Sequence, residues 1–233
     1  TSNFRAGVNA GNSIASGGTF NVAVGDESGT AITTGDHNVA VGYESLKTED
    51  AHGHNTAVGS QALKTLNAGA DGKNTAVGAF AGKLMTEGVQ NTLIGGLAGD
   101  ALTHADFNTV VGYQALSADT FGHRSTAIGY SALNAQNFAS STNSSNTAVG
   151  YHSGLSVSTG IRNTIIGSEA GDALSDADDN VAIGALALSG DRKGNKSTAI
   201  GRGALKVQDF SSSTDSNNTA VGYSAGESVT TGQ

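Results

Sequence analysis

One stretch of the sequence matches a catalytic motif. Residues 222–226 read Gly-Tyr-Ser-Ala-Gly, the Gly-x-Ser-x-Gly pattern of a nucleophile elbow, in which a serine attacks an acyl carbon. The same positions of a repeating pattern read Gly-Ala-Phe-Ala-Gly at residues 78–82, so the match follows from the repeat. No cluster of acids and bases interrupts the repeat, as an enzyme with a repetitive fold would require. The sequence therefore predicts a protein that is not an enzyme.

Two groups of side chains have the chemistry of ion ligands. His37 and His54 occupy the same place in consecutive repeats, so we expect them to stack one strand spacing apart, where a ring of imidazoles could bind a metal or an anion. Four aspartates (Asp172, Asp176, Asp178 and Asp179) lack the spacing of an EF-hand calcium loop. Exposed histidines and a solvated acidic turn explain both groups without an ion. The sequence therefore assigns no metal ligands and no cofactor.

A five-residue phrase organises the whole chain. It reads Asn-Thr-Ala-Val-Gly at residues 74–78 and returns, with conservative changes, mostly every 17 residues. Such a period is the signature of a solenoid, in which each copy is one coil stacked on the next. The sequence predicts an all-β parallel β-solenoid of about 13 coils, forming a single repeat domain over residues 1–233. The fixed positions of two copies are Asn74, Val77, Gly78, Asn146, Val149 and Gly150.

The strand in each coil is apolar on both faces. Counting the Asn as position 0, position 2 is small or apolar and position 3 is always Val or Ile. Neighbouring strand residues point to opposite faces, so both positions favour burial. The opposite side of the same coil can cover one face, and we expect partner chains to cover the other. Stacked Asn amides predict a hydrogen-bonded ladder, and a second short strand is expected at positions 6–9.

Glycine marks two positions of the coil. Position 4 is glycine in every copy, which suits a positive φ or a backbone approach too close for a Cβ. Position 8 alternates two glycines with two leucines along the chain, and the coils of 19 and 21 residues are always the second leucine coil. The repeating unit is therefore four coils. A core that alternately narrows and widens is one interpretation of this period.

Composition limits the partners. The formal net charge of −8 argues against nucleic acid and anionic lipid. No apolar run approaches the ~20 residues that span a membrane, so we expect no membrane insertion of this segment. The absence of cysteine excludes disulfides and thiolate metal sites. The sequence begins at Thr1 without a methionine or a signal-like segment, and we expect it to be a fragment of a longer protein.

The repeats resemble those of trimeric autotransporter adhesin heads, whose coils carry a similar small apolar phrase ending in Ile-Gly or Val-Gly. The 17-residue form, Asn-Thr-Ala-Val-Gly-Tyr-x-Ala-Leu with a polar turn, is more similar still to repeats of phage tail-fibre and related surface-fibre proteins; residues 108–116 and 125–133 are its best copies. The resemblance covers nearly the whole chain. It implies a left-handed β-roll, a homotrimer around one axis and attachment to a surface. The coils depart from those of the adhesin heads in their greater length and inserted loops.

The two 21-residue coils end in polar insertions that each follow a phenylalanine. Insertions in a solenoid project as loops, often on the binding side. The predicted receptor-binding residues are Phe138, Ser140, Asn143, Phe210, Ser212, Asp215, Tyr130 and Arg202. A tolerated surface loop is the alternative for the insertions. The tyrosines, all at position 5, could pack at a coil corner or form a sugar-stacking stripe.

These patterns predict an extracellular, structural and attachment segment of a trimeric viral tail fibre. Its partners would be two further copies of itself and a host cell-surface polysaccharide or protein, with no nucleic acid. The alternative is the head of a bacterial trimeric autotransporter adhesin at the cell surface. An ice-binding solenoid fits less well, because the threonines form one column with valine interruptions instead of flat paired ranks.

Overall fold

The computed structural model describes residues 2–233, in which strands and turns occur and no helix is present. The chain divides into two compact units, the first ending at Tyr113 and the second beginning at Gln114. The strands of the first unit are β1 (Phe4–Ala6), β2 (Val22–Val24), β3 (Val39–Val41), β4 (Thr56–Val58), β5 (Thr75–Val77), β6 (Thr92–Ile94) and β7 (Thr109–Val111). Those of the second are β8 (Gly122–His123), β9 (Thr126–Ile128), β10 (Thr142–Asn143), β11 (Thr147–Val149), β12 (Thr164–Ile166), β13 (Val181–Ile183), β14 (Gly194–Asn195), β15 (Thr198–Ile200), β16 (Thr214–Asp215) and β17 (Thr219–Val221).

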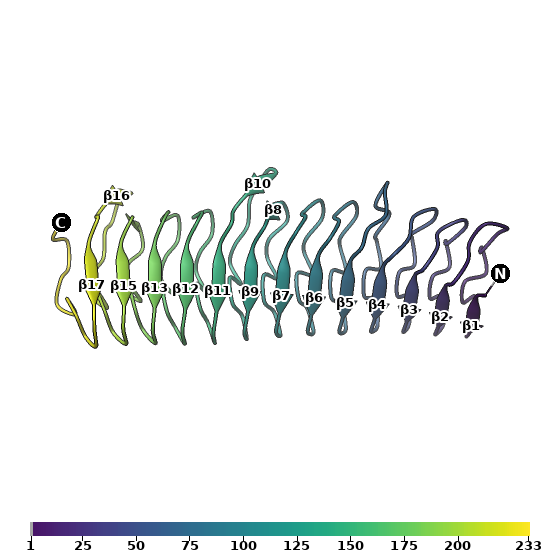
Figure 1. Cartoon of the computed structure of the whole chain (residues 1–233), viewed down its shortest axis with the longest axis horizontal. Helices are drawn as coiled ribbons and strands as arrows, with labels where there is room; N and C mark the ends of the chain where they lie inside the picture. The colour runs from purple at the N-terminus through teal and green to yellow at the C-terminus, as the bar shows by residue number, and fades with distance from the viewer. Residues whose placement is uncertain (1) are drawn as a thin grey trace. The chain divides into compact units, whose positions relative to one another are not determined.

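Each unit is a parallel β-solenoid (Figure 1). The strands of successive coils pair in parallel with the repeating phrase in register: Ala57 of β4 lies opposite Ala76 of β5, and Ala148 of β11 opposite Ile165 of β12. The predicted all-β parallel solenoid of about 13 coils is therefore confirmed. Its handedness, its association into trimers and its description as one domain stay predictions.

The two faces of the strand have different surroundings. The position-2 side chains, such as Ala76 and Ala148, are fully buried against the other side of their own coil. The position-3 side chains point outward, and Val77, Ile94 and Ile166 remain 37 to 39 % exposed. The strand thus has one face covered by its own chain, as expected, and an outward apolar face.

The buried asparagines at position 0 link each coil to its neighbour. Asn146 is typical: its Oδ1 accepts the backbone N–H of Asn163 at 2.9 Å, and its Nδ2 donates to the carbonyl of Gly160, across the same coil, at 2.7 Å. The predicted contact between amides is also present, with Asn163 Nδ2 3.2 Å from Asn146 Oδ1. The ladder therefore satisfies buried backbone groups as well as the amides, which explains why asparagine is used here.

The glycine at position 4 has both properties that the sequence suggested. Gly78 has a φ of +137°, and a Cβ on it would lie closer than 2.5 Å to the backbone oxygen of Gly95 in the next coil. Gly150 has a φ of +140°, and its Cβ would lie 2.6 Å from the oxygen of Gly167. The coils therefore stack at a spacing that leaves no room for a side chain at this corner.

The second strand expected at positions 6–9 is not formed. These residues make turns, and positions 6 and 8 adopt the left-handed conformation, as at Glu44 (φ 53°) and Leu46 (φ 47°). The turns still bond to the next coil, since the amide of Leu46 donates to the carbonyl of Ala62 at 2.9 Å. Alternating conformations curl the backbone and prevent the extended geometry of a strand.

The four-coil period reflects which position supplies the large apolar side chain of the core. In a glycine coil it comes from position 11: Ile32 Cδ1 lies 2.8 Å from where a Cβ of Gly29 would stand. In a leucine coil the leucine fills this space, and position 11 is a buried acid or glutamine in five of six cases. These polar residues are Glu49, Asp119, Gln136, Asp191 and Gln208; the sixth leucine coil has Leu66. The structure thus gives the period a more specific cause than a change in core width.

Candidate functional site

The inserted loops of the second unit are folded onto the coil before them. Each forms a two-residue parallel strand, β10 pairing with β8 and β16 pairing with β14. Buried serines close the loops: Ser144 Oγ donates to the carbonyl of His123 and Ser216 Oγ to that of Asn195, each at 2.8 Å. The insertions are therefore loops whose backbone is fixed by hydrogen bonds to the preceding coil.

The expectation that Phe138 and Phe210 provide exposed aromatic anchors is wrong for this structure. The two side chains are only 5 % and 6 % exposed. The backbone amide of each phenylalanine donates at 3.3 Å to a buried aspartate of the preceding coil, Asp119 and Asp191 respectively. The rings therefore belong to the interior, and burying them stabilises the loop by the ordinary hydrophobic effect.

Each phenylalanine lies next to a buried pair of an acid and a glutamine. Gln136 Nε2 donates to Asp119 Oδ2 at 2.6 Å, and Gln208 Nε2 donates to Asp191 Oδ2 at the same distance. All four side chains are fully buried. The sequence analysis missed these pairs, although the appearance of a polar residue at position 11 of the leucine coils was a visible signal.

The other predicted loop residues are exposed: Ser140, Asn143, Ser212 and Asp215. Asp215 Oδ2 forms an ion pair with Lys196 Nζ at 2.6 Å, and this contact lowers the pKa of the Asp215 carboxyl. The backbone oxygens of Ser140 and Ser212 accept from the hydroxyls of Thr142 and Thr214, each at 2.9 Å. The exposed residues therefore offer polar groups on a fixed backbone, and their role in receptor binding stays a prediction.

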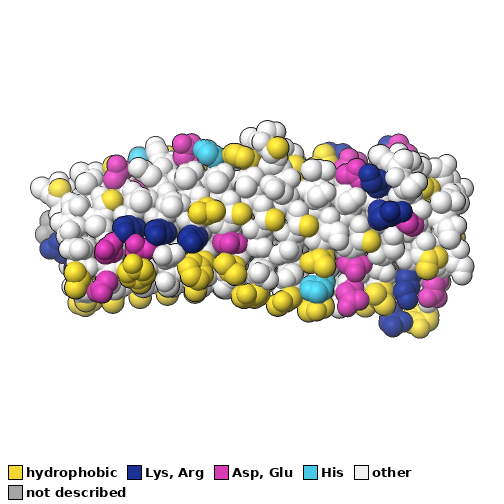
Figure 2. Space-filling view, turned by 180° about the vertical axis from the view of Figure 1, so that it is seen from behind, with side chains coloured by type: hydrophobic (Ala, Val, Ile, Leu, Met, Phe, Trp, Pro, Cys, Tyr) yellow, Lys and Arg dark blue, Asp and Glu magenta, His cyan; other side chains and the backbone are white. Residues whose placement is uncertain are grey.

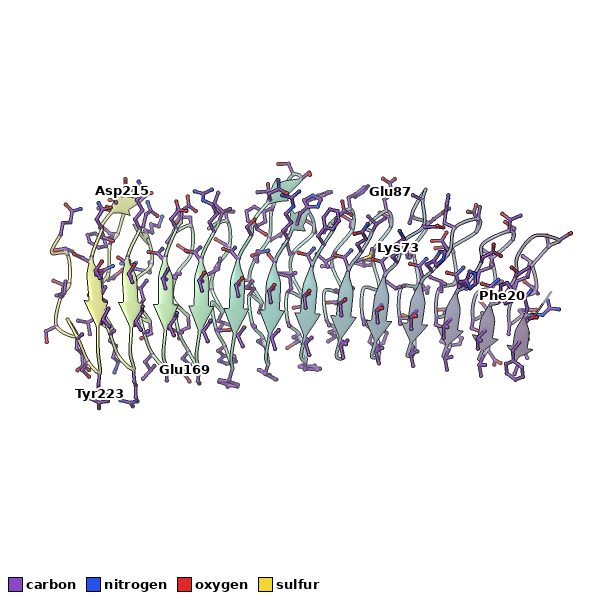
Figure 3. All side chains as sticks on the ribbon, viewed as in Figure 1. Phe20, Lys73, Glu87, Glu169, Asp215 and Tyr223 are labelled. Carbon is purple, nitrogen blue, oxygen red and sulfur yellow. The ribbon has the colours of Figure 1, made fainter. Side chains whose placement is uncertain are left out.

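Tyr130 and Arg202, the remaining predicted residues, belong to the position-5 column and not to the loops. Tyr130 stacks on Tyr151, with ring centroids 5.5 Å apart, and the Arg202 guanidinium lies 5.9 Å from the centre of the Tyr223 ring. Figure 3 shows Tyr223 at the lower edge of the second unit and Asp215 at its upper edge. The proposed site therefore separates into two surfaces, a polar loop surface and an aromatic edge.

The four aspartates of the acidic turn in the second unit contact different partners. Asp179 forms a bidentate pair with Arg162 at 2.6 and 2.8 Å, which lowers the pKa of its carboxyl. Asp178 accepts the amide of Ile161 at 2.8 Å, and Asp176 lies 3.5 Å from Lys193 Nζ. Burial raises the pKa of the Asp172 carboxyl. The acidic turn is therefore a partly buried, paired surface and not the fully solvated face that the sequence suggested.

The histidines stack as predicted. The rings of His37 and His54 are 5.1 Å apart, and Phe20 extends the stack with its ring 5.0 Å from that of His37. His54 Nδ1 lies 3.4 Å from an oxygen of Asp71. The ring of Phe20 covers one side of the His37 ring, so the column continues as an aromatic stack. The absence of metal ligands at these histidines stays a prediction.

The match to the nucleophile elbow falls on the corner of a coil. Gly222 and Gly226 occupy positions 4 and 8, with φ of +130° and +62°, and the amide of Ser224 donates to the carbonyl of Arg202 at 2.9 Å. Position 4 is glycine in every coil, and position 8 is glycine in the coils that alternate with the leucine coils. The geometry thus agrees with the interpretation of the motif as a product of the repeat.

Comparison of the chain with protein-family models, with curated proteins and with solved structures finds no match. No helix in residues 2–233 is long and apolar enough to cross a membrane. Inference about function therefore starts from the surfaces described above.

Proposed function

We propose that the chain is a structural and attachment segment of a homotrimeric surface fibre of the viral tail-fibre type, located outside the cell. The observation that carries this proposal is the outward apolar face of the strands. Within each unit it combines the half-exposed Val and Ile column at position 3 with tyrosines at position 5, of which Tyr43, Tyr113, Tyr130 and Tyr151 are 47 to 51 % exposed. Figure 2 shows hydrophobic side chains along the lower edge of the units.

Self-association is the most economical way to cover such a face. A contiguous apolar surface on a soluble protein marks an interaction site. The face repeats every coil, so a second copy that contacts one coil in register contacts the others in the same way. Contacts of this kind close into a ring when the rotation between copies allows. In a ring of three copies, the position-3 and position-5 columns of each copy would be covered by the other two. The same arrangement would serve the head of a bacterial adhesin, which is the alternative to a viral fibre.

Sedimentation velocity tests the assembly. We expect the parent chain to sediment as a trimer at micromolar concentration, and Ile166→Glu to raise the trimer dissociation constant by about 100-fold or more, because three carboxylates would be brought into an apolar interface. The matched control is Thr159→Glu, which adds the same charge at an exposed turn outside the strand face. A parent chain that sediments as a folded monomer would sink the proposal of a trimeric fibre.

Attachment is assigned to the polar loop surface, defined as Ser140, Asn143, Ser212 and Asp215. A trimer would present each loop three times, so weak contacts with a host polysaccharide or surface protein would add through avidity. Deleting residues 140–143 is a poor test, because it removes β10 and its pairing with β8. Substitution of side chains that point to solvent keeps these backbone contacts.

We expect the fourfold alanine variant of the polar loop surface to bind host cells about tenfold or more weakly than the parent, since a few residues of an interface carry most of the binding energy and avidity multiplies the loss at each loop. Binding is measured with fluorescently labelled trimer at matched concentrations. A control with Ser156→Ala and Thr159→Ala removes exposed hydroxyls from a regular coil and should bind like the parent. If the loop variant binds host cells as tightly as the parent and keeps the parent's melting temperature, the loops do not contribute to attachment.

A further inference from the structure

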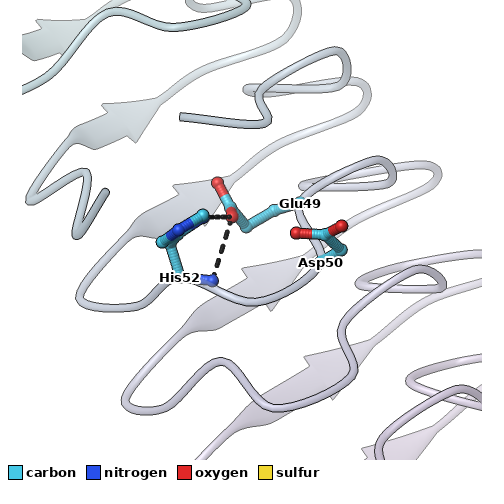
Figure 4. Close-up of side chains that lie close together, drawn as sticks. All are labelled: Glu49, Asp50 and His52. Atoms are coloured by element: carbon cyan, nitrogen blue, oxygen red, sulfur yellow. Dashed lines mark hydrogen bonds and ion pairs between the residues drawn. The ribbon is translucent and has the colours of Figure 1, made fainter. Parts of the chain in front are cut away.

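Three ligand-type side chains converge in the coil between β3 and β4 of the first unit (Figure 4). They are Glu49, Asp50 and His52, and one ligand atom from each lies within 4.8 Å of the others. The Glu49 side chain is fully buried, while the His52 side chain is 28 % exposed. His52 Nδ1 lies 3.4 Å from Glu49 Oε1. The cluster thus joins one buried carboxylate to two groups that reach solvent.

In the second unit, two other buried acids occupy position 11 of the coil, the position of Glu49, and glutamine side chains donate hydrogen bonds to them. Asp119 and Asp191 each accept a hydrogen bond from a glutamine in the next coil, at 2.6 Å. The residue three places later is glycine, and a Cβ on Gly194 would collide with the Asp191 carboxylate. The arrangement therefore consists of Asp, Gly and Gln at fixed positions.

The Glu49 coil departs from this arrangement at all three positions. The acid is longer by one methylene, Leu66 stands where the next coil would supply the glutamine, and His52 stands where the glycine would be. Position 14 is glycine or alanine in each of the other regular 17-residue coils, so this histidine is an exception to the repeat. The His52 imidazole therefore approaches the buried acid from the same coil, whereas the other two acids accept a hydrogen bond from a glutamine of the next coil.

The groups of the cluster are poorly satisfied by the protein alone. His52 Nδ1 is buried and has no hydrogen-bond partner. Glu49 accepts only two long hydrogen bonds, from the amides of His52 and Ala68, both at 3.3 Å. Burial raises the pKa of the Glu49 carboxyl. A buried polar atom without a hydrogen-bond partner calls for an explanation, and a bound ion is one that also fits the facing carboxylate of Glu49.

We propose that Glu49, Asp50 and His52 form a binding site for a divalent transition-metal ion, of which zinc is the representative. Two metal–ligand bonds of about 2.1 Å at a tetrahedral angle separate their ligand atoms by about 3.4 Å, the distance found between His52 Nδ1 and Glu49 Oε1. The imidazole nitrogen favours zinc, nickel or copper over calcium and magnesium, which prefer oxygen ligands alone. Two carboxylates balance the charge of the ion.

The backbone of this turn is already hydrogen-bonded to its neighbours, since the amide of Thr33 donates to the carbonyl of Asp50 at 2.6 Å and Asn38 Nδ2 to that of His52 at 3.0 Å, so a bound ion would add order to the three side chains. Asp50 Oδ1 accepts the amide of Ala51 at 2.5 Å, which leaves Oδ2 for the ion, and water would complete the coordination from the exposed side of His52. The second oxygen of Glu49 contacts the amide of Ala68 in the inserted loop of the next coil. Glu49 thus links two consecutive coils, and an ion bound to its Oε1 would hold that carboxylate in place; this assignment adds a metal where the sequence predicted none.

Calorimetric titration of the whole, metal-free chain with zinc chloride tests the proposal. We expect one zinc ion per chain and a rise in melting temperature with added zinc. His52→Asn should weaken binding by about 100-fold, since it keeps a short polar group near the Glu49 carboxylate but removes the imidazole ligand. The matched control is His104→Asn, which alters a histidine beside Glu87 and should leave the affinity unchanged.

A second variant separates loss of zinc binding from loss of folding. The triple substitution Glu49→Asp, His52→Gly and Leu66→Gln installs the arrangement of the Asp191 coil, so it should melt close to the parent and lose zinc binding. X-ray absorption of the parent should show nitrogen and oxygen ligands at about 2.0–2.2 Å. Zinc affinity equal to that of the parent in either variant, or no binding by the parent at millimolar zinc, would overturn the proposal.

Discussion

Replacing Gly150 by alanine is expected to lower the free energy of unfolding by about 3–5 kcal/mol. Two costs add at this corner. The φ of +140° lies in a region that side-chain-bearing residues rarely adopt, and the new Cβ would stand 2.6 Å from the oxygen and 2.7 Å from the carbon of Gly167. The neighbouring atoms are backbone, so they cannot move aside without separating the coils. Urea unfolding followed by circular dichroism, at matched chain concentration, measures the loss.

The control for this variant is Gly69→Ala in the first unit. Gly69 also has a positive φ, +66°, but a Cβ on it would have no atom within 4 Å. Only the left-handed conformation is then unfavourable, at a cost of about 1–2 kcal/mol. Similar losses at both glycines would mean that conformation alone, and not the close stacking of coils, requires glycine at position 4.

The sequence predicted the parts of the fold that depend on a single coil and its nearest neighbour. Asn146, Val149 and Gly150 recur at a fixed spacing because each contacts its own copy one coil away, and such contacts leave a periodic signal. The strand, the asparagine ladder and the glycine corner were therefore predictable. The turns at positions 6–9 were not predicted, because residues other than glycine adopt the left-handed conformation at position 6 and in the leucine coils at position 8, as at Glu44 and Leu46.

The candidate site was predictable only in part, because its residues contact partners at unequal spacings. Phe138 follows the pattern of an exposed loop in the sequence, yet it is buried beside Asp119, 19 residues earlier. Arg202 belongs to the same coil as Asp215 in the sequence, but its guanidinium lies 5.9 Å from the ring of Tyr223, and Figure 3 shows Tyr223 at the edge opposite Asp215. Glu49 and His52 stand out only after the columns of the repeat are aligned, since each is unremarkable by itself.

Gln208→Leu is expected to destabilise the second unit by about 3–5 kcal/mol, as a test of the buried pair. Gln208 Nε2 donates to Asp191 Oδ2 and to Ser197 Oγ at 2.9 Å, and its Oε1 accepts Asn218 Nδ2 at 2.7 Å. Leucine would leave all three groups without this partner. Asp191 would keep backbone donors, the closest from Gly194 at 2.9 Å, on its Oδ1 alone. The free energy of unfolding is again measured in urea.

The matched control is Gln61→Leu, the same substitution at another glutamine that donates to a carboxylate. Gln61 Nε2 lies 2.8 Å from Glu44 Oε2, but Glu44 also pairs with Lys47 and Lys64, each at 2.7 Å, and these contacts lower its pKa to about 2. The charge therefore stays compensated, and Gln61→Leu should cost about 1 kcal/mol or less. A double-mutant cycle with Asp191→Ala should recover a coupling of about 1–3 kcal/mol for Gln208. A coupling near zero would show that the glutamine stabilises the coil through Ser197 and Asn218, and that Asp191 is held by its backbone donors alone.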